Sequence, residues 1–206
     1  MKQQVEKTAY RFEKYCGIDR WSSYHYQLKE TLALNPSSVL EVGKGDGVFG
    51  HYLRDEAKVN YQSLDLAADL HPDIVGEVEH IPLTDGAVDV AVAFEVLEHI
   101  PFERFASGLT ELLRVAKSHV IISLPHFGPS IRFSIKFPFM KEKRFAWKLP
   151  YHPLHVFGGE HYWEIGKKGY ETAVVREAVT KLADIEKEFV PFENQYHHFF
   201  VLRKRI

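Results

Sequence analysis

The sequence predicts an α/β fold built on a mainly parallel sheet, and three features of the 206-residue chain point to it. Short apolar runs alternate with helical stretches up to about residue 125, which is typical of βαβ units with right-handed crossovers. A glycine-rich turn at residues 43–47 follows the first apolar run. An acidic residue, Asp65, ends the second. A chain of this length fits one domain, so we expect residues 1–206 to form a single unit.

The first two parts of that unit are an N-terminal helical segment, residues 1–35, and a core, residues 36–125. Tyr24, Leu28 and Leu32 recur at four-residue spacing, which indicates an amphipathic helix. In the core we expect strands at 39–42, 61–64, 73–76, 88–94 and 120–124, and helices at 48–57 and 102–116. The run 88–94 is almost entirely apolar, as in a strand that is covered on both faces.

Residues 126–158 break this alternation and are expected to form an inserted cap or long loop. Prolines and glycines lie there among aromatic rings, and the rings argue against disorder. The rings belong to Phe127, Phe133, Phe137, Phe139, Phe145 and Trp147, and the basic residues between them are Arg132, Lys136, Lys141, Lys143, Arg144 and Lys148. The basic residues are compatible with an acidic or lipid-like substrate, with a membrane surface, or with a solvated face. Residues 159–206 are expected to add a helix at 171–182 and strands at 185–190 and 197–202.

Composition narrows the class of partner. The net charge is −2, so no strong field recruits nucleic acid, and no nucleic-acid partner is expected. No apolar run approaches the length of about 18 residues that spans a bilayer, so no stable membrane insertion is expected. Cys16 is the single cysteine and cannot form an internal disulfide. Together with a polar N-terminus that lacks the apolar core of a signal peptide, this predicts a cytoplasmic protein.

The glycine-rich turn predicts a cofactor that contains adenosine. Glycines at 43, 45 and 47 let the backbone approach a ligand closely, and Asp65 could accept hydrogen bonds from both hydroxyls of a ribose. A dinucleotide fingerprint requires a third glycine or alanine where this chain has Val48. Asp46 also places a negative charge where a pyrophosphate would sit. A nicotinamide-dependent oxidoreductase is therefore disfavoured, and a turn that merely connects strand to helix is the remaining alternative.

These motifs resemble the class I S-adenosylmethionine (SAM)-dependent methyltransferases, in particular the methyltransferase type 11 branch. Residues 41–47 resemble the first motif of that family, E/D-x-G-x-G-x-G, and Asp65 matches its ribose-binding acid. Three further segments resemble family motifs in the family's order: 75–83, 88–92 and 94–101. The resemblance covers about residues 38–125, and residues 196–202 are similar to the last strand of the same fold.

The resemblance implies a Rossmann-like seven-stranded sheet of order 3-2-1-4-5-7-6, with strand 7 antiparallel, helices on both faces and the inserted cap after strand 5. It implies SAM as the cofactor, held by Glu41, Gly43, Lys44, Gly45, Gly47, Asp65, Leu66, Glu77, Val78, Phe94 and Glu95. Lys44 departs from the small residue or cysteine that is frequent in the family, which is tolerable if its side chain leaves the loop. Residues 67–72 are also too short for the usual helix between strands 2 and 3.

SAM brings an activated methyl group, so the protein must mainly align the acceptor and exclude water, and a base is needed only for an acceptor that loses a proton. His99 is a candidate base, with an ordering role in the loop after strand 4 as the alternative. Glu98 is expected as an acid at a helix N-terminus. No metal is expected, because His152, His155, His161 and Glu160 match no standard zinc spacing. Residues 126–158 are expected to form a lid over the acceptor.

The sequence therefore predicts a methyltransferase that acts on an unidentified small-molecule acceptor. An alternative of another class is a non-catalytic protein of the SAM-binding fold that binds or activates a partner. The intact set of Gly43, Gly45 and Asp65 argues against that alternative, because a pocket without function tends to lose its acids.

Overall fold

A seven-stranded sheet forms the centre of the computed structural model, which describes residues 11–205. Its strands are β3 (Ile74–Val75), β2 (Asn60–Asp65), β1 (Ser38–Val42), β4 (Val88–Phe94), β5 (Ala116–Pro125), β9 (His197–Lys204) and β8 (Ala183–Phe189), in that spatial order. The first five pair in parallel, and β9 runs antiparallel between β5 and β8. This confirms the expected order, with β9 as the seventh strand of the sheet.

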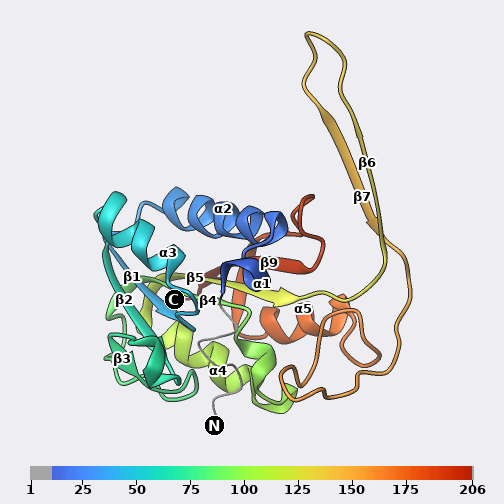
Figure 1. Ribbon diagram of the computed structural model, residues 1–206. Helices are drawn as coiled ribbons and strands as arrows, with labels where there is room; N and C mark the ends of the chain where they lie inside the picture. Colours follow the sequence, from blue (N-terminus) through green and yellow to red (C-terminus); the bar gives the residue numbers. More distant parts are fainter. Residues whose placement is uncertain (1–10, 206) are drawn as a thin grey trace.

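Helices cover both faces of the sheet (Figure 1). On one face lie α2 (Ile18–Ala33) and α3 (Val48–His51), and on the other lie α4 (Phe102–Val115) and α5 (Thr172–Thr180). The expected helix at 48–57 is confirmed in place, but its second half, Tyr52–Glu56, is a π-helix. The short helix α1 (Phe12–Tyr15) precedes α2. Within residues 11–205, no helix is both long and apolar enough to cross a membrane.

Two apolar layers hold the helices to the sheet, because successive strand residues point to opposite faces. In β1, Leu40 faces the layer of α4 and α5, where Phe105, Leu109 and Trp163 are fully or almost fully buried. Val39 faces the layer of α2 and α3, with Phe49. The helical face predicted for α2 is confirmed: Tyr24 is buried, and Leu28 and Leu32 are half-buried against this second layer.

The strand order reverses between β1 and β4, and this reversal places the candidate site. In open α/β sheets, ligands bind beyond the carboxyl ends of the strands at such a switch point. The glycine-rich turn after β1, Asp65 at the end of β2 and the residues after Phe94 all lie at this edge. The connection from β2 to β3 contains only a short 3-10 helix, Ala68–Leu70, as the length of residues 67–72 predicted.

Residues 126–158 contain more regular structure than the sequence analysis expected. They form an antiparallel hairpin, β6 (Ser130–Ile135) and β7 (Lys143–Lys148), whose far end extends away from the body of the molecule (Figure 1). Near its base, Arg132 donates hydrogen bonds to the carbonyl oxygens of Phe192 (3.0 Å) and Glu193 (2.9 Å), and Arg144 pairs with the Glu193 carboxylate. Its apolar side chains are largely exposed: Ile131, Phe133, Ile135, Phe137, Phe139, Met140, Phe145 and Trp147.

Two tryptophans of the second half of the chain lie in opposite environments, which gives a matched test of the core. Trp163 is fully buried against Phe102 and Phe105, and its indole N–H donates to the Ile100 carbonyl (3.0 Å), whereas Trp147 is 56% exposed on the hairpin. We expect Trp163→Ala to lower the free energy of unfolding by about 3–5 kcal/mol in urea denaturation, through the cavity that it leaves. Trp147→Ala should change it by no more than about 0.5 kcal/mol. Equal effects of the two changes would contradict this description of the core.

Candidate functional site

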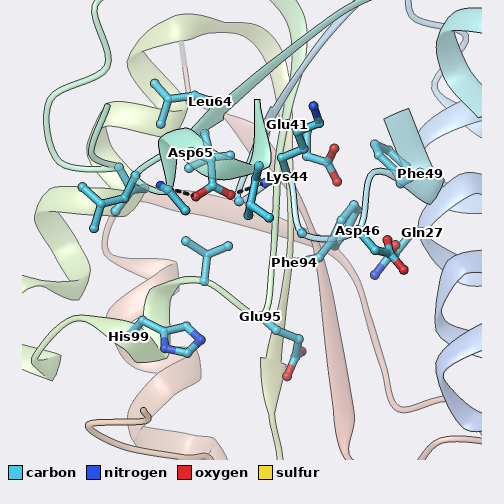
Figure 2. A pocket seen from close by; sticks show the side chains of 18 of the residues that line it. Gln27, Glu41, Lys44, Asp46, Phe49, Leu64, Asp65, Phe94, Glu95 and His99 are labelled. Atoms are coloured by element: carbon cyan, nitrogen blue, oxygen red, sulfur yellow. Dashed lines mark hydrogen bonds between the residues drawn. The ribbon is translucent and has the colours of Figure 1, made fainter. Parts of the chain in front are cut away.

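A cavity of about 360 Å³ opens at the carboxyl ends of β1, β2 and β4, within the usual size range of small-molecule sites. All of the expected cofactor residues except Gly47 line it, and so does the candidate base His99. Figure 2 shows Asp65 near the middle of the view, with Glu95 and His99 across the cavity from it. The motifs that the sequence singled out therefore converge on one site.

The turn after β1 requires glycine at its first position. Gly43 has φ +84°, and a Cβ atom there would lie 2.3 Å from Cγ2 of Val96. Gly45 (φ +54°) and Gly47 (φ +79°) also adopt left-handed backbone, which side chains disfavour. The amide of Gly43 donates to the Leu64 carbonyl (2.8 Å), so the turn is tied to the end of β2. The backbone itself forms this wall of the cavity.

Asp65 is held by the backbone on both of its carboxylate oxygens. Oδ2 accepts from the amide of Lys44 (2.7 Å) and Oδ1 accepts from the amide of Ala67 (2.8 Å), as the dashed lines in Figure 2 show. A carboxylate has about four acceptor positions, so each oxygen retains capacity for another donor. Because the side chain lines the cavity, it fits a pair of neighbouring hydroxyls such as those of a ribose.

The two departures from the family pattern are connected in the structure. The Lys44 side chain leaves the loop, as its position required, and its Nζ donates to the His71 carbonyl (2.5 Å). His71 follows the short 3-10 helix and has left-handed backbone (φ +51°). Leu66, Ala67 and Leu70 of this short connection still line the cavity. The missing helix therefore does not remove the apolar wall on this side.

Glu41 is a buried acid rather than an exposed carboxylate. The hydroxyl of Tyr61 donates to its Oε2. Burial raises the pKa of Glu41 to about 8, the nearby Asp46 and Asp65 add to the rise, and the Tyr61 hydrogen bond and Lys44 oppose it. Tyr61 can reach Glu41 because Gly50 lies in its path: a Cβ atom on Gly50 would be 2.3 Å from the Tyr61 hydroxyl oxygen.

One wall of the cavity comes from α1 and α2, which the sequence analysis did not assign to the site. Tyr15, Arg20, Tyr24 and Gln27 line it. The Tyr24 hydroxyl donates to Oδ2 of Asp46 (2.5 Å), whose Oδ1 accepts from the amide of Val48 (3.2 Å) at the start of α3. These residues could have been predicted from the spacing of Arg20, Tyr24 and Gln27, which places them on one face of a helix that was expected to pack against the core.

The opposite wall begins at the end of β4. Glu95 adopts left-handed backbone (φ +57°), which is strained for a residue with a side chain and is concentrated at functional sites. Its Oε2 lies 3.7 Å from Nε2 of His197, and its Oε1 has no hydrogen-bond partner among the described residues. Burial raises the pKa of Glu95 to about 7, against the opposing effect of Arg20.

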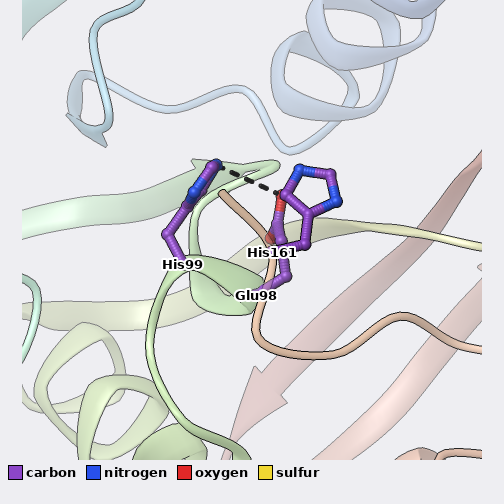
Figure 3. A group of neighbouring side chains, drawn as sticks. All are labelled: Glu98, His99 and His161. Atoms are coloured by element: carbon purple, nitrogen blue, oxygen red, sulfur yellow. Dashed lines mark ion pairs between the residues drawn. The ribbon is translucent and has the colours of Figure 1, made fainter. Parts of the chain in front are cut away.

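Glu98 lies in the first turn of a short helix, as expected, but its side chain does not face solvent. It belongs to a 3-10 turn, Leu97–His99, and is fully buried. Neither carboxylate oxygen has a hydrogen-bond partner within the described part of the chain. The nearest charged or titratable nitrogens are Nε2 of His99 (3.8 Å) and Nε2 of His161 (3.9 Å) (Figure 3). Burial, and the neighbouring Glu95 after it, raise the pKa of Glu98 well above its ordinary value.

His99 has both a structural contact and a place in the cavity wall. Its Nδ1 lies 3.1 Å from the Glu160 carbonyl, which ties the turn after β4 to the loop at residue 160. Burial, and the neighbouring His161 after it, lower the pKa of His99 to about 4. The ring is therefore neutral at pH 7. Its role as a base stays a prediction.

The histidines that follow the hairpin separate into two kinds. His152 and His155 contact backbone carbonyls, those of Gly166 (2.9 Å) and His161 (2.8 Å). His161 instead lines the cavity and packs edge-to-face against His99, with ring centroids 5.0 Å apart. The meeting of His161 with Glu98 and His99 could not be predicted, because these residues are distant in sequence.

Comparisons with known proteins agree with this geometry. Residues 40–124 match the family described as a methyltransferase domain. The N-methyltransferase NodS from Bradyrhizobium japonicum, in complex with S-adenosylhomocysteine, has a similar fold (TM-score 0.64, 9% identity, 98% of this chain and 95% of that chain). 1,6-Didemethyltoxoflavin-N1-methyltransferase from Burkholderia thailandensis also has a similar fold (TM-score 0.58, 14% identity, 97% of this chain and 85% of that chain). Magnesium protoporphyrin IX methyltransferase from Synechocystis is a third protein of similar fold (TM-score 0.56, 12% identity, 100% of this chain and 90% of that chain). No curated protein matches the chain.

Glu41 predicts a pH dependence of stability. Its pKa is raised in the folded state, so between about pH 4.5 and 8 the unfolded chain loses this proton while the folded chain keeps it, and stability falls as pH rises. We expect the free energy of unfolding of the wild type, measured relative to Glu41→Gln, to decrease across that window. Tyr61→Phe removes a donor but keeps the acid, so it should retain the decrease. A difference that is the same at pH 5 and pH 8 would contradict the assignment.

Proposed function

We propose that this chain, which carries a class I SAM-dependent methyltransferase domain, transfers the methyl group of SAM to a small-molecule acceptor. The observation that carries the proposal is the arrangement of Asp65 and the glycine turn on one side of a single cavity, with Glu95, His99 and His161 on the other. The first side fits an adenosine-containing cofactor. The second supplies polar groups beside it that fit an acceptor.

The residues of the cofactor side have separate roles in this proposal. The remaining acceptor capacity of Asp65 would bind the ribose hydroxyls, and Leu66 would pack against the adenine, with the Val78 amide near its exocyclic amine. Glu77, which also lines the cavity, would lie near the exocyclic amine. The turn around Gly43 and Gly45 would hold the methionine part, with Asp46 close to the positive end of that group. SAM carries its methyl group on a positively charged sulfur and so supplies the electrophile itself.

The acceptor side would then orient a nucleophile and exclude water. Neutral His99 is placed to take a proton from an acceptor that must lose one, although its lowered pKa makes it a weak base. The range of acceptors among proteins of similar fold supports a small molecule as the substrate class. The Burkholderia thailandensis enzyme has 1,6-didemethyltoxoflavin bound, and a further neighbour is a glycopeptide N-methyltransferase.

The cofactor assignment is tested by titration with SAM and S-adenosylhomocysteine. We expect binding in the micromolar range, about −8 kcal/mol, in isothermal calorimetry. Asp65→Ala should weaken binding by about 1.5–3 kcal/mol, the scale of hydrogen bonds to a charged group.

A matched control for that variant is Asp85→Ala, since Asp85 is exposed, pairs with Arg114 and does not line the cavity. This control should bind SAM as the wild type does. A folded wild type that gives no heat with either ligand, or an Asp65 variant that binds as tightly as the control, would refute the assignment.

The expected lid is a separate prediction. In the described structure none of residues 126–158 lines the cavity, so a lid role would require the hairpin to change position when an acceptor binds. We expect replacement of residues 130–150 by a short Gly/Ser linker to leave SAM affinity within about threefold, roughly 0.7 kcal/mol. Methyl transfer to an identified acceptor should fall much further. Transfer at the wild-type rate would show that the hairpin is no lid, and loss of SAM binding would place it in the cofactor site.

A further inference from the structure

We propose that Glu98, His99 and His161 bind one divalent transition-metal ion in the wall of the cavity opposite Asp65. One ligand atom from each residue, a carboxylate oxygen and two imidazole nitrogens, lies within 4.8 Å of the other two. Figure 3 shows the Glu98 carboxyl group beside the His161 ring, with a dashed line joining it to His99. Two of the three residues line the cavity, so the site faces the space where an acceptor would bind.

The outer contacts of the two histidines are made by Nδ1, and Nε2 is the ring nitrogen that lies nearest to Glu98 in each. Nδ1 of His99 lies 3.1 Å from the Glu160 carbonyl, and Nδ1 of His161 lies 3.0 Å from Oε1 of Glu164. A carbonyl and a carboxylate can only accept, so each Nδ1 carries a proton. Tyr196 donates its own hydroxyl to Glu164 (2.7 Å) and does not change this assignment. Metal-binding histidines show the same pattern, with the non-ligating nitrogen donating to a carbonyl or carboxylate.

Glu98 lacks the donors that a buried carboxyl group needs. Its two oxygens have no hydrogen-bond partner among the described residues, although the side chain is fully buried. Nε2 of His99 and Nε2 of His161 lie 3.8 and 3.9 Å from it, too far to donate a hydrogen bond. A proton on Glu98 itself would not provide a hydrogen bond either, because the distances of 3.8 and 3.9 Å from its Oε1 to the two Nε2 atoms exceed hydrogen-bond distance. A cation held between this buried carboxyl group and the two rings would satisfy it.

The ligand set favours a particular class of ion. Two imidazoles and one carboxylate suit Zn²⁺ and neighbouring divalent transition metals, whereas Ca²⁺ and Mg²⁺ prefer oxygen ligands. Ligand atoms about 2.0–2.1 Å from a tetrahedral ion lie about 3.4 Å apart. The two nitrogen–oxygen distances are 3.8 and 3.9 Å and all three distances are within 4.8 Å, so the ligands would move together when an ion binds. Glu95 adds a second buried carboxyl group that interacts electrostatically with this cluster. Three protein ligands leave a position open toward the cavity, as in catalytic zinc sites.

An ion at this position would also narrow the acceptor class, and this part rests on the proposed function. It would favour acceptors that carry an oxygen or nitrogen able to ligate a metal. Binding of the metal does not depend on that role, so the two can be tested apart.

The experiment uses the full chain, stripped with a chelator and titrated with Zn²⁺ in a calorimeter, with Co²⁺ absorbance as a second measure of ligand geometry. We expect one ion per chain. Glu98→Gln and His161→Asn should each weaken Zn²⁺ binding by more than about 100-fold, beyond the 10–100-fold that loss of an outer hydrogen bond costs. Glu164→Ala, which removes only the outer partner of His161, should fall within that smaller range. His51→Asn is the matched control, because His51 is exposed and pairs with Asp55 (2.6 Å) outside the cavity.

The same preparations are titrated with SAM, which separates the two proposals. SAM binding without stoichiometric Zn²⁺ uptake by the wild type would overturn the metal site alone. Zn²⁺ binding without SAM binding would overturn only the proposed function. Zn²⁺ uptake by His161→Asn equal to that of the His51 control would place the ion elsewhere. If Glu98→Gln does not fold, His161→Asn and the Co²⁺ spectrum of the wild type still test the metal site. A spectrum typical of hexaaquo cobalt would exclude the site.

Discussion

The rest of the site depends on the carboxylate of Asp65 and its two backbone hydrogen bonds. β1 and β2 are neighbours in register, with Val42 opposite Leu64, and the chain leaves both strands at the same edge. By accepting from the amides of Lys44 and Ala67, Asp65 joins the turn after β1 to the connection after β2. Two loops that would otherwise diverge then become the two sides of one cavity. The Lys44 side chain, bonded to the His71 carbonyl, makes the same connection from the outside.

Local rules made the cofactor side of the site predictable. The left-handed backbone of Gly43 and the close approach of Val96 are steric requirements that the glycine pattern expresses directly. The run in β4 is apolar because the strand is covered on both faces, and its bounds were predicted as found. The sequence of the hairpin also has the alternating apolar residues of a strand, but the prolines around it favoured the prediction of a loop. Ile131, Phe133 and Ile135 alternate along β6, but both faces of the ribbon are exposed, so the alternation marks no boundary between core and solvent.

The acceptor side could not be derived from the sequence because its groups meet only through the packing of distant segments. Glu98 was expected as an acid at a helix N-terminus, but its burial depends on the loop that carries His161 and Trp163. The backbone of that loop reaches back to the same turn, since the amide of Tyr162 donates to the Glu98 carbonyl (2.8 Å). The polar residues of α2 were not predicted to line the cavity for a related reason. Tyr24 serves as a core residue and as the donor to Asp46 at once.

The anchoring of the hairpin has a mechanical consequence. A two-stranded ribbon is marginally stable by itself. This ribbon is attached to the body of the molecule by the contacts of Arg132 and Arg144 with Phe192 and Glu193. The same stretch leads directly into Tyr196, which lines the cavity and donates to Glu164. The base of the ribbon and one part of the cavity wall therefore share the β8–β9 connection. A change in the position of the ribbon would alter the surroundings of Tyr196 even though no hairpin residue lines the cavity.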